Sequence, residues 1–176
     1  MQSLLFAMCL VACVAKTLGQ GLNYTELEFE SITNAPWQWR SNASGNKTMR
    51  LEDPYGVKKI RFTLCAEPAN PTQQVWLAFT DIHYANDGPS DTITLFFNNE
   101  PIGSVETKEK WHSGHEWNEL QRTGRVTMMF SVGSGTYPVD LVAVTDGWGV
   151  ELDKIVLRTD NQDPNVDIFC GAILIE

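Results

Sequence analysis

Residues 92–98 read TITLFFN, and residues 57–66 read VKKIRFTLCA. In the first stretch Ile93, Leu95 and Phe97 occupy alternate positions, and apolar residues of the second stretch alternate in the same way. A period of two is typical of a β-strand with one buried face. Both stretches therefore predict strands that pack one side against a hydrophobic core.

Similar patterns continue along most of the chain. Residues 75–85 are apolar on both faces at their start, which predicts a strand covered on both sides with Trp76 in the core. Further strands are predicted at 126–132, 139–143, 149–158 and 166–175. Turn residues separate these stretches at 86–89, 98–101, 133–135 and 146–147. With no amphipathic helix in any window, the pattern predicts an all-β fold, a two-sheet antiparallel β-sandwich or jelly roll.

The N-terminal residues predict secretion. An apolar run from Leu4 to Ala15 is too short for a membrane span, and Thr17 and Gly19 are small residues suited to a signal-peptidase site. Residues 1–19 are therefore predicted to be a signal peptide and residues 20–176 a single domain; the alternative is a buried N-terminal helix. The rest of the chain also has no apolar run long enough to cross a membrane.

Cysteines and sequons agree with an extracellular location. Outside the predicted signal peptide the chain holds two cysteines, Cys65 and Cys170, which predict one disulfide; the alternative is two separate buried thiols. Asn23, Asn42 and Asn46 each begin an N-glycosylation sequon. We expect a secreted glycoprotein.

The charge of the chain excludes some classes of partner. Its formal net charge is −9 at pH 7. Nucleic acids and anionic membranes require Lys- and Arg-rich surfaces, so neither is an expected partner. An acidic surface is compatible with binding cations or neutral sugars.

Several segments, taken in order, resemble carbohydrate-binding modules of families 6 and 35. HYANDG at 83–88, TITLFFN at 92–98 and IGSV at 102–105 are similar to a strand ending in Tyr-Ala-Asn, a strand ending in Val-Asn-Gly and a hairpin return. EWN at 116–118 resembles the tryptophan-bearing segment of these modules, and residues 149–157 resemble their closing strand. The resemblance implies a galactose-binding-like jelly roll that binds carbohydrate and usually carries structural calcium.

The chain also departs from these modules in two ways. Asn98-Asn99 stands where Asn-Gly is usual. These modules are commonly attached to a glycoside hydrolase, and no catalytic domain is predicted here.

Three carboxylates are the predicted calcium ligands. Calcium binds hard oxygen ligands. Glu28 and Glu30 project to one side of an extended segment, and Asp153 is predicted to share a strand face with apolar Ile155, where a carboxylate needs a partner. The resemblance implies an ion held by a Glu-x-Glu pair and by an Asp of the last strand, which Glu28, Glu30 and Asp153 match. The alternative is a solvated glutamate face with Asp153 at a frayed strand end.

Tryptophans in turn-rich segments are the predicted sugar contacts. Apolar C–H faces of sugars stack on aromatic rings, and nearby polar groups bind their hydroxyls. Trp148, which lies between two glycines and close to Asp146, is the first candidate; Trp117 with Asn118 is the second. The remaining tryptophans of polar, turn-rich segments are Trp37, Trp39 and Trp111. For each of these tryptophans the alternative is packing beneath a loop.

No signature of catalysis is present in the sequence. Nucleophile and metalloprotease motifs are absent, and no pair of acids is marked by its spacing as a glycosidase pair. His112 and His115 lack a third zinc ligand and are predicted to be surface residues. We therefore predict a secreted, non-enzymatic, calcium-stabilised carbohydrate-binding module. The alternative is an extracellular protein that uses the same sandwich to bind protein partners.

Overall fold

The computed structural model describes residues 23–31, 37–52, 59–68, 70–110, 116–160, 170 and 174–175. The predicted signal peptide, Trp111, His112, His115 and most of the predicted strand 166–175 lie outside these residues. No helix among the described residues has the length and apolar character needed to cross a membrane.

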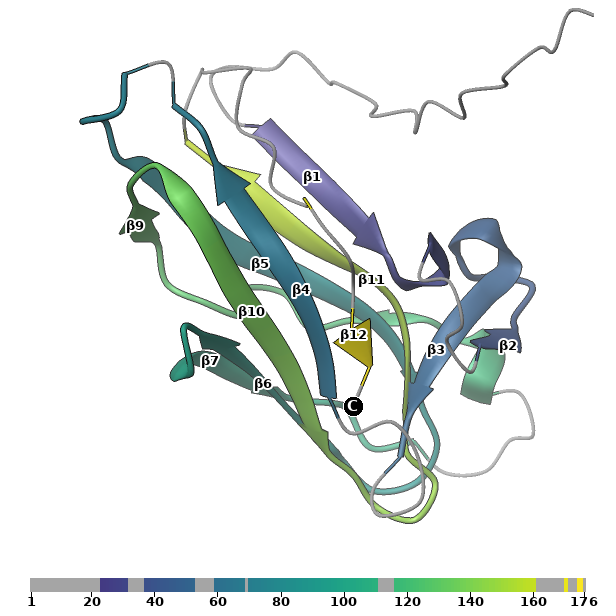
Figure 1. The fold of residues 1–176 in the computed structure, drawn as a ribbon. Coiled ribbons are helices and arrows are strands. Elements are labelled where there is room, and N and C mark those ends of the chain that lie inside the picture. Colours follow the sequence, from purple (N-terminus) through teal and green to yellow (C-terminus); the bar gives the residue numbers. More distant parts are fainter. Residues whose placement is uncertain are drawn as a thin grey trace, which may run out of the picture.

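The described residues form two antiparallel sheets, and the larger of them contains seven strands (Figure 1). Its central path is β2 (Trp37–Trp39), β3 (Lys47–Leu51), β11 (Val150–Thr159), β5 (Val75–Asn86) and β8 (Gln121–Arg122). Two further strands join it: β1 (Asn23–Glu28) pairs with β11, and β9 (Phe130–Val132) pairs with β5. The described connections also contain three short 3-10 helices: η1 (Phe29–Ser31), η2 (Ser44–Asn46) and η3 (Glu116–Asn118).

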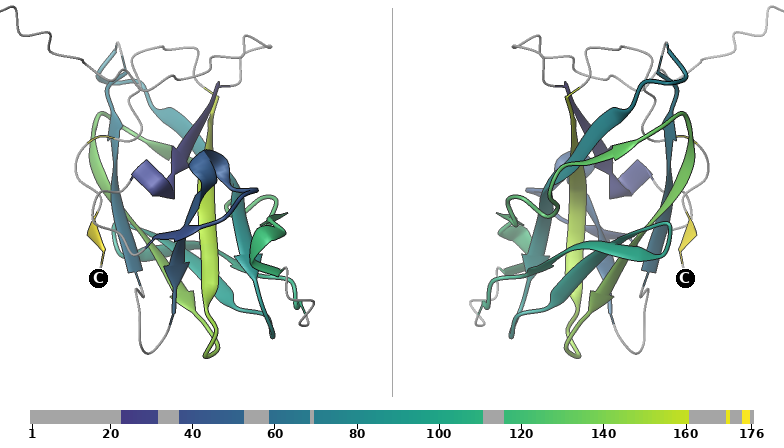
Figure 2. Two further views of the ribbon diagram at one scale, coloured as in Figure 1. Left: turned by 90° about the vertical axis from the view of Figure 1, so that its right-hand side faces the viewer. Right: turned by 90° about the vertical axis from the view of Figure 1, so that its left-hand side faces the viewer.

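The second sheet, with five strands in the described part of the chain, packs face to face on the first (Figures 1 and 2). Its order is β12 (Leu174–Ile175), β4 (Lys59–Ala66), β10 (Gly135–Val144), β6 (Thr92–Phe97) and β7 (Glu100–Glu106). The predicted two-sheet β-sandwich is confirmed.

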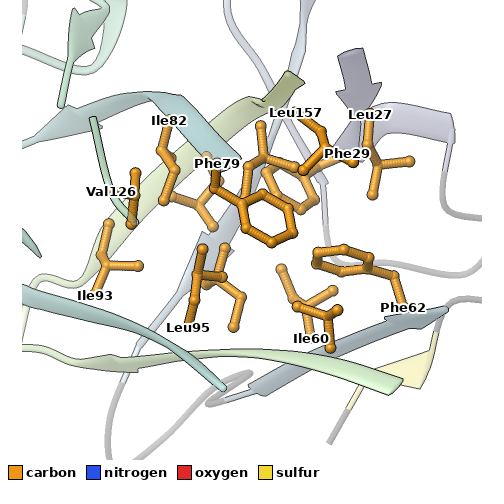
Figure 3. Packing of buried hydrophobic residues seen from close by; sticks show 14 of the residues in the cluster. Leu27, Phe29, Ile60, Phe62, Phe79, Ile82, Ile93, Leu95, Val126 and Leu157 are labelled. Carbon is orange, nitrogen blue, oxygen red and sulfur yellow. The ribbon is translucent and has the colours of Figure 1, made fainter. Parts of the chain in front are cut away.

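The core fills the space between the two sheets (Figure 3). The second sheet contributes Ile60 and Phe62 of β4 and Leu95 of β6 to this core. The larger sheet contributes Phe79 of β5 and Leu157 of β11. The rings of Phe62 and Phe79 meet edge to face across the interface, with centroids 6.1 Å apart. The strict alternation of buried residues along β4 confirms the pattern that predicted this strand.

Two predictions for individual strand residues are wrong. Trp76 is 48% exposed, because Val75 and Leu77 turn into the core and leave the intervening side chain on the outer face of the sheet. The strand predicted at 126–132 covers only Phe130–Val132, and Met128 is exposed. The N–H groups of Val126 and Thr127 both donate to the carbonyl of Phe79, which interrupts a regular ladder.

Asp153 does not share a face with Ile155, contrary to the sequence prediction. Leu152 pairs with Tyr84 and Lys154 with His83, so Asp153 is the extra residue of a β-bulge. The bulge shifts the alternation and places both Leu152 and Ile155 in the core. Asp153 therefore points to the outer side of the sheet.

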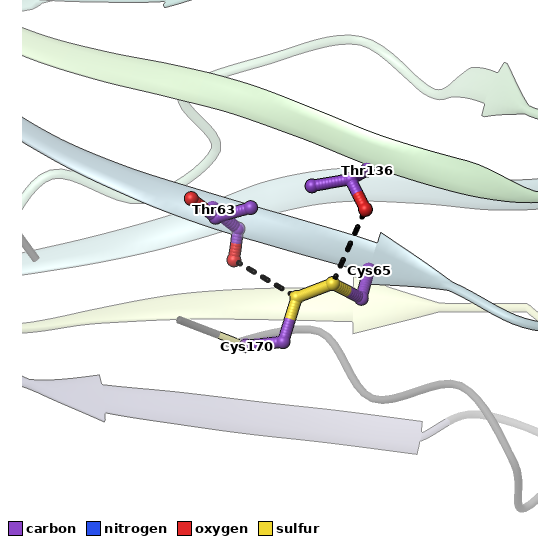
Figure 4. The surroundings of a disulfide bond; sticks show 4 residues. All are labelled: Thr63, Cys65, Thr136 and Cys170. Carbon is purple, nitrogen blue, oxygen red and sulfur yellow. Dashed lines mark hydrogen bonds between the residues drawn. A yellow bond between two sulfur atoms is a disulfide. The ribbon is translucent and has the colours of Figure 1, made fainter. Parts of the chain in front are cut away.

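The predicted disulfide between Cys65 and Cys170 is confirmed (Figure 4). The two Cα atoms are 5.8 Å apart and separated by 105 positions in the sequence. The N–H of Cys170 also donates to the carbonyl of Thr63, 3.2 Å away, so backbone and side chain both attach the C-terminal segment to β4.

Candidate functional site

Three connections meet at the end of the sandwich drawn at the bottom of Figure 1. They are the segment after β5, the segment after β7 and the β10–β11 turn. Asp91, from the first, accepts a hydrogen bond from the N–H of Asp146 in the third (2.8 Å), and its carbonyl accepts one from Thr107 in the second (2.8 Å). We call this region, residues 86–91, 106–110 and 145–149, the loop end.

The β10–β11 turn presents a tryptophan to solvent. Asp146 Oδ1 accepts hydrogen bonds from the N–H groups of Trp148 (2.7 Å) and Gly149 (3.2 Å). Gly149 has φ +76°, and a Cβ there would collide with the carbonyl oxygen of Leu51, so only glycine fits this close approach. The backbone is thus held in place while the Trp148 side chain remains 54% exposed.

Buried polar groups beneath the turn hold the loop end together. The fully buried amide of Asn86 donates to the carbonyls of Pro89 (2.8 Å) and Lys108 (3.3 Å) and to the hydroxyl of Thr107 (3.2 Å). Burial raises the pKa of Asp91 to about 6, although its hydrogen bond from the Asp146 backbone acts in the opposite direction. From the sequence, residues 86–89 predicted only a turn; the packing role of Asn86 required the fold.

The second predicted sugar segment, Trp117 with Asn118, lies close to the first. Arg50, which sequence reasoning missed, donates a hydrogen bond to the carbonyl of Trp148. The same guanidinium lies 4.9 Å from the centroid of the Trp117 ring, and that of Arg40 lies 5.8 Å from it. Arg50 therefore bridges the two predicted segments, and both arginines pack against the Trp117 indole.

The β3–β11 pairing positions Arg50, and an ion pair with Glu151 of β11 positions Arg40. Arg50 of β3 lies opposite Glu151 of β11 in the strand register, and the Glu151 side chain is fully buried. Arg40 makes a two-pronged ion pair with this carboxylate (Nε–Oε2 2.6 Å, Nη2–Oε1 2.5 Å), and Thr48 donates a further hydrogen bond to it (2.7 Å). The negative charge of Glu151 is thus compensated, as a buried carboxylate requires.

The predicted calcium ligands are gathered on the outer side of the larger sheet. Burial and the neighbouring Glu28 raise the pKa of Glu30, and Asp153 adds to the effect, so the three carboxylates lie within electrostatic range. Glu30 Oε2 is buried without a hydrogen-bond partner. Asp153 accepts hydrogen bonds from the N–H (2.8 Å) and hydroxyl (3.4 Å) of Ser44.

The cluster is not arranged as a complete metal site. A Cβ at Gly45 would collide with the Glu30 carboxylate, so the η2 turn packs directly on it. Among the described residues, no three acidic, histidine or cysteine side chains are placed to hold one metal ion.

The three sequon asparagines lie on the surface. Asn23, at the start of β1, and Asn42 and Asn46, in the β2–β3 hairpin, are all exposed. Asn42 Nδ2 donates to the carbonyl of Asn118 (2.6 Å), which brings this sequon next to the Trp117 segment.

Comparison of the structure with solved structures places the fold. A family 35 carbohydrate-binding module from Clostridium thermocellum superposes with a TM-score of 0.53 and 14% identity over 77% of this chain and 97% of the module. The fold is similar to that of family 35 carbohydrate-binding modules. A second such module, from Cellvibrio japonicus, gives a TM-score of 0.54 and 13% identity over 86% of this chain and 97% of the module.

The same fold occurs as part of a much longer enzyme. A cycloisomaltooligosaccharide glucanotransferase from Paenibacillus matches with a TM-score of 0.52 and 15% identity, over 74% of this chain but 18% of the enzyme. No protein-family model and no curated protein sequence matches the chain. The fold predicted from the resemblance is confirmed.

Proposed function

We propose that this protein binds carbohydrate without cleaving it, at the loop end, with Trp148 as the aromatic platform. The observation that carries the proposal is a half-exposed indole on a turn whose backbone is pinned by Asp146. A ring carried on an ordered backbone reduces the conformational entropy lost on binding, and the C–H face of a sugar stacks on an exposed indole.

Polar groups beside Trp148 suit the hydroxyls of a sugar. Asp146 Oδ2 accepts no hydrogen bond from the described residues and lies next to Gly88, whose missing side chain leaves room there. Trp117 and Asn118 flank the site on the far side of Arg50. Sugar sites of this kind combine one or two aromatic rings with a few fixed polar groups.

A glycan array probed with the secreted, disulfide-bonded protein tests this proposal. For any glycan that binds, Trp148→Ala should reduce the affinity by about 1 to 3 kcal/mol, the range for losing an anchoring aromatic contact. The melting temperature should change little, because this side chain is largely outside the core. Trp117→Ala is the matched variant for the second segment.

Two results would contradict the proposal. Unchanged affinity of the Trp148→Ala protein would remove this ring from the site. A blank array, together with specific capture of an extracellular protein by the same sample, would favour the alternative that the sandwich binds protein partners.

We also propose that Glu28, Glu30 and Asp153, which are not placed to hold one ion in this structure, move together to bind a structural calcium ion. The support is the gathering of three carboxylates and the buried Glu30 Oε2, which accepts no hydrogen bond and would be a ligand of the ion. A bound Ca²⁺ would supply positive charge to a cluster in which like charges and burial disfavour ionisation.

Chelation tests the calcium proposal. A ligand at 100 times its dissociation constant adds about 2.7 kcal/mol to stability. EGTA should therefore lower the melting temperature of the wild-type protein by several degrees and that of Asp153→Ala by much less. An equal response of the two proteins would remove Asp153 from the site.

Secretion is part of the same proposal. The predicted signal peptide, the disulfide and the three exposed sequon asparagines all suit an extracellular protein. Expression in a secreting eukaryotic cell, followed by mass spectrometry before and after enzymatic deglycosylation, should find the protein in the medium with Gln20 at its N-terminus and glycan mass on it. Retention in the cell without glycan would contradict it.

A further inference from the structure

The β2–β3 hairpin is a basic segment in an acidic protein. The formal net charge of the chain is −9, yet residues 37–51 contain three cations (Arg40, Lys47 and Arg50) and no aspartate or glutamate. Arg40 is paired with Glu151, and Arg50 lies 3.2 Å from Glu52. Two of the three cations are therefore compensated by neighbouring carboxylates.

Lys47 is placed differently, against two indole rings. Its Nζ lies 4.4 Å from the ring centroid of Trp37 and 5.5 Å from that of Trp39. Among the described residues no carboxylate lies within ion-pair distance of this amine, although Glu30 is close enough to be influenced by its charge. A cation over two aromatic rings is held in position while its N–H groups remain able to donate.

The two tryptophans form an exposed corner. Both project from the same side of the edge strand β2, where Trp37 pairs with Met49 and Trp39 with Lys47. Their rings are nearly perpendicular (87°) with centroids 5.6 Å apart. Trp37 is 41% and Trp39 64% exposed, so ring surface is open to a ligand beside the Lys47 amine.

We propose that Trp37, Trp39 and Lys47 form a second saccharide site, one that takes an acidic sugar. The C–H face of the sugar stacks on Trp39, and its carboxylate or sulfate accepts hydrogen bonds from the Lys47 amine. The positive charge of Lys47 favours a negatively charged ligand. The exposed indoles favour a sugar ring over a bare anion.

This site is separate from the loop end. Lys47 stands three residues before Arg50 on β3, about 10 Å away at the rise of a β-strand. Arg50, not Lys47, contacts the Trp148 turn. Lys47 begins β3, and it is the opposite end of this strand, at Arg50 and Leu51, that contacts the β10–β11 turn. The proposal therefore does not depend on sugar binding at Trp148.

Chondroitin oligosaccharides of matched length test the site, because one backbone can be prepared with three charge states. The unsulfated form carries carboxylates, chondroitin sulfate adds sulfates, and carboxyl-reduced chondroitin is neutral. By calorimetry at low salt, we expect the wild-type protein to bind the neutral form about tenfold or more weakly than an acidic form, the size of one charge-assisted hydrogen bond. Comparison of the two acidic forms identifies whether carboxylate or sulfate is the better ligand.

Variants assign the binding to this corner. Lys47→Gln should abolish the preference for acidic forms, and Trp39→Ala should weaken the binding of all forms. Trp148→Ala should change neither this preference nor the affinity. Asn46 precedes Lys47 and begins a sequon, so the series is repeated in Asn46→Gly, since glycine accepts its φ of +63° and removes any glycan. Melting temperatures check that each variant is folded.

The following outcomes would overturn the proposal. Equal binding of acidic and neutral chondroitin by the wild-type protein would exclude a role for the Lys47 charge. Unchanged binding by both Lys47→Gln and Trp39→Ala would place the ligand elsewhere. Binding to phosphatidylserine vesicles, but to no chondroitin form, would mean that the corner contacts lipid.

Discussion

The buried carboxylate of Asp91 accepts a hydrogen bond from the backbone N–H of Asp146, 2.8 Å away, and thereby ties the β5–β6 connection to the turn that carries Trp148. Asp91 is 1% exposed, and its Oδ2 has no hydrogen-bond partner. Removal from water therefore raises the pKa of Asp91 to about 6.

This raised pKa predicts that the contribution of Asp91 to the stability of the fold increases as the pH falls from 7.5 to 5. An unfolded aspartate titrates near 3.9, so between about pH 4 and 6 the folded state binds a proton that the unfolded state does not. The stabilisation is complete below the unfolded pKa and is lost as the pH rises through about 6. The total is about 2 to 3 kcal/mol.

Comparison with Asp91→Asn isolates this contribution. Denaturant unfolding of both proteins between pH 4 and 8 should give a difference in unfolding free energy that varies with pH through about 6. A pH-independent difference between the two proteins would mean that Asp91 does not titrate in this range.

The pair of Arg61 and Asp140 on the second sheet predicts the opposite dependence. Arg61 Nε and Nη2 donate to the carboxylate at 2.5 and 2.7 Å, and these hydrogen bonds lower the pKa of Asp140. The stabilisation is present above the unfolded pKa of about 3.9 and is lost as the pH falls through the lower folded value. Since the Arg61 side chain is 32% exposed, we expect a loss of about 1 kcal/mol.

Acid titration of Asp140→Asn checks this contribution. The variant should be less stable than the wild-type protein at pH 6, and the difference should shrink below pH 4. A difference of the same size at pH 6 and pH 3 would contradict the assigned pKa shift.

Sequence periodicity predicted the sheets because each face of a strand meets one environment. Along β4 every second side chain is buried, so the alternation in the sequence is the alternation in the structure. The resemblance, which covers roughly residues 26 to 158, added the jelly-roll fold, which the similarity to family 35 modules confirms. The disulfide followed from two cysteines in a predicted secreted chain.

Features that depend on non-local contacts were not predictable in the same way. Trp76 is an apolar residue within an apolar run, and nothing in the run indicates that the sheet face it joins is uncovered. The bulge at Asp153 has no signature in the sequence, yet it moves this carboxylate from one face to the other. Arg50 joins two candidate segments only because β3 pairs with β11.

Replacing both Cys65 and Cys170 by serine should lower the stability of the domain by roughly 4 to 5 kcal/mol, the chain-entropy value for a loop of about a hundred residues. The bridge closes 105 positions, so its loss gives the unfolded chain much more freedom. Thermal unfolding of the wild-type and double-serine proteins measures the effect. A double-serine protein with an unchanged melting temperature would show that the backbone contacts of β12 with β4 are sufficient.

Two aromatic residues of β5, Trp76 and Phe79, allow an outer-face position to be compared with a core position on the same strand. Phe79 is fully buried and contacts Phe62 across the sandwich, so Phe79→Ala should cost about 3 to 5 kcal/mol. Trp76 has the larger side chain but is 48% exposed, and Trp76→Ala should cost only about 1 to 2 kcal/mol. Denaturant unfolding of the two variants gives the comparison directly. If Trp76→Ala proved as destabilising as Phe79→Ala, the half-exposed position of Trp76 on the outer face would be contradicted.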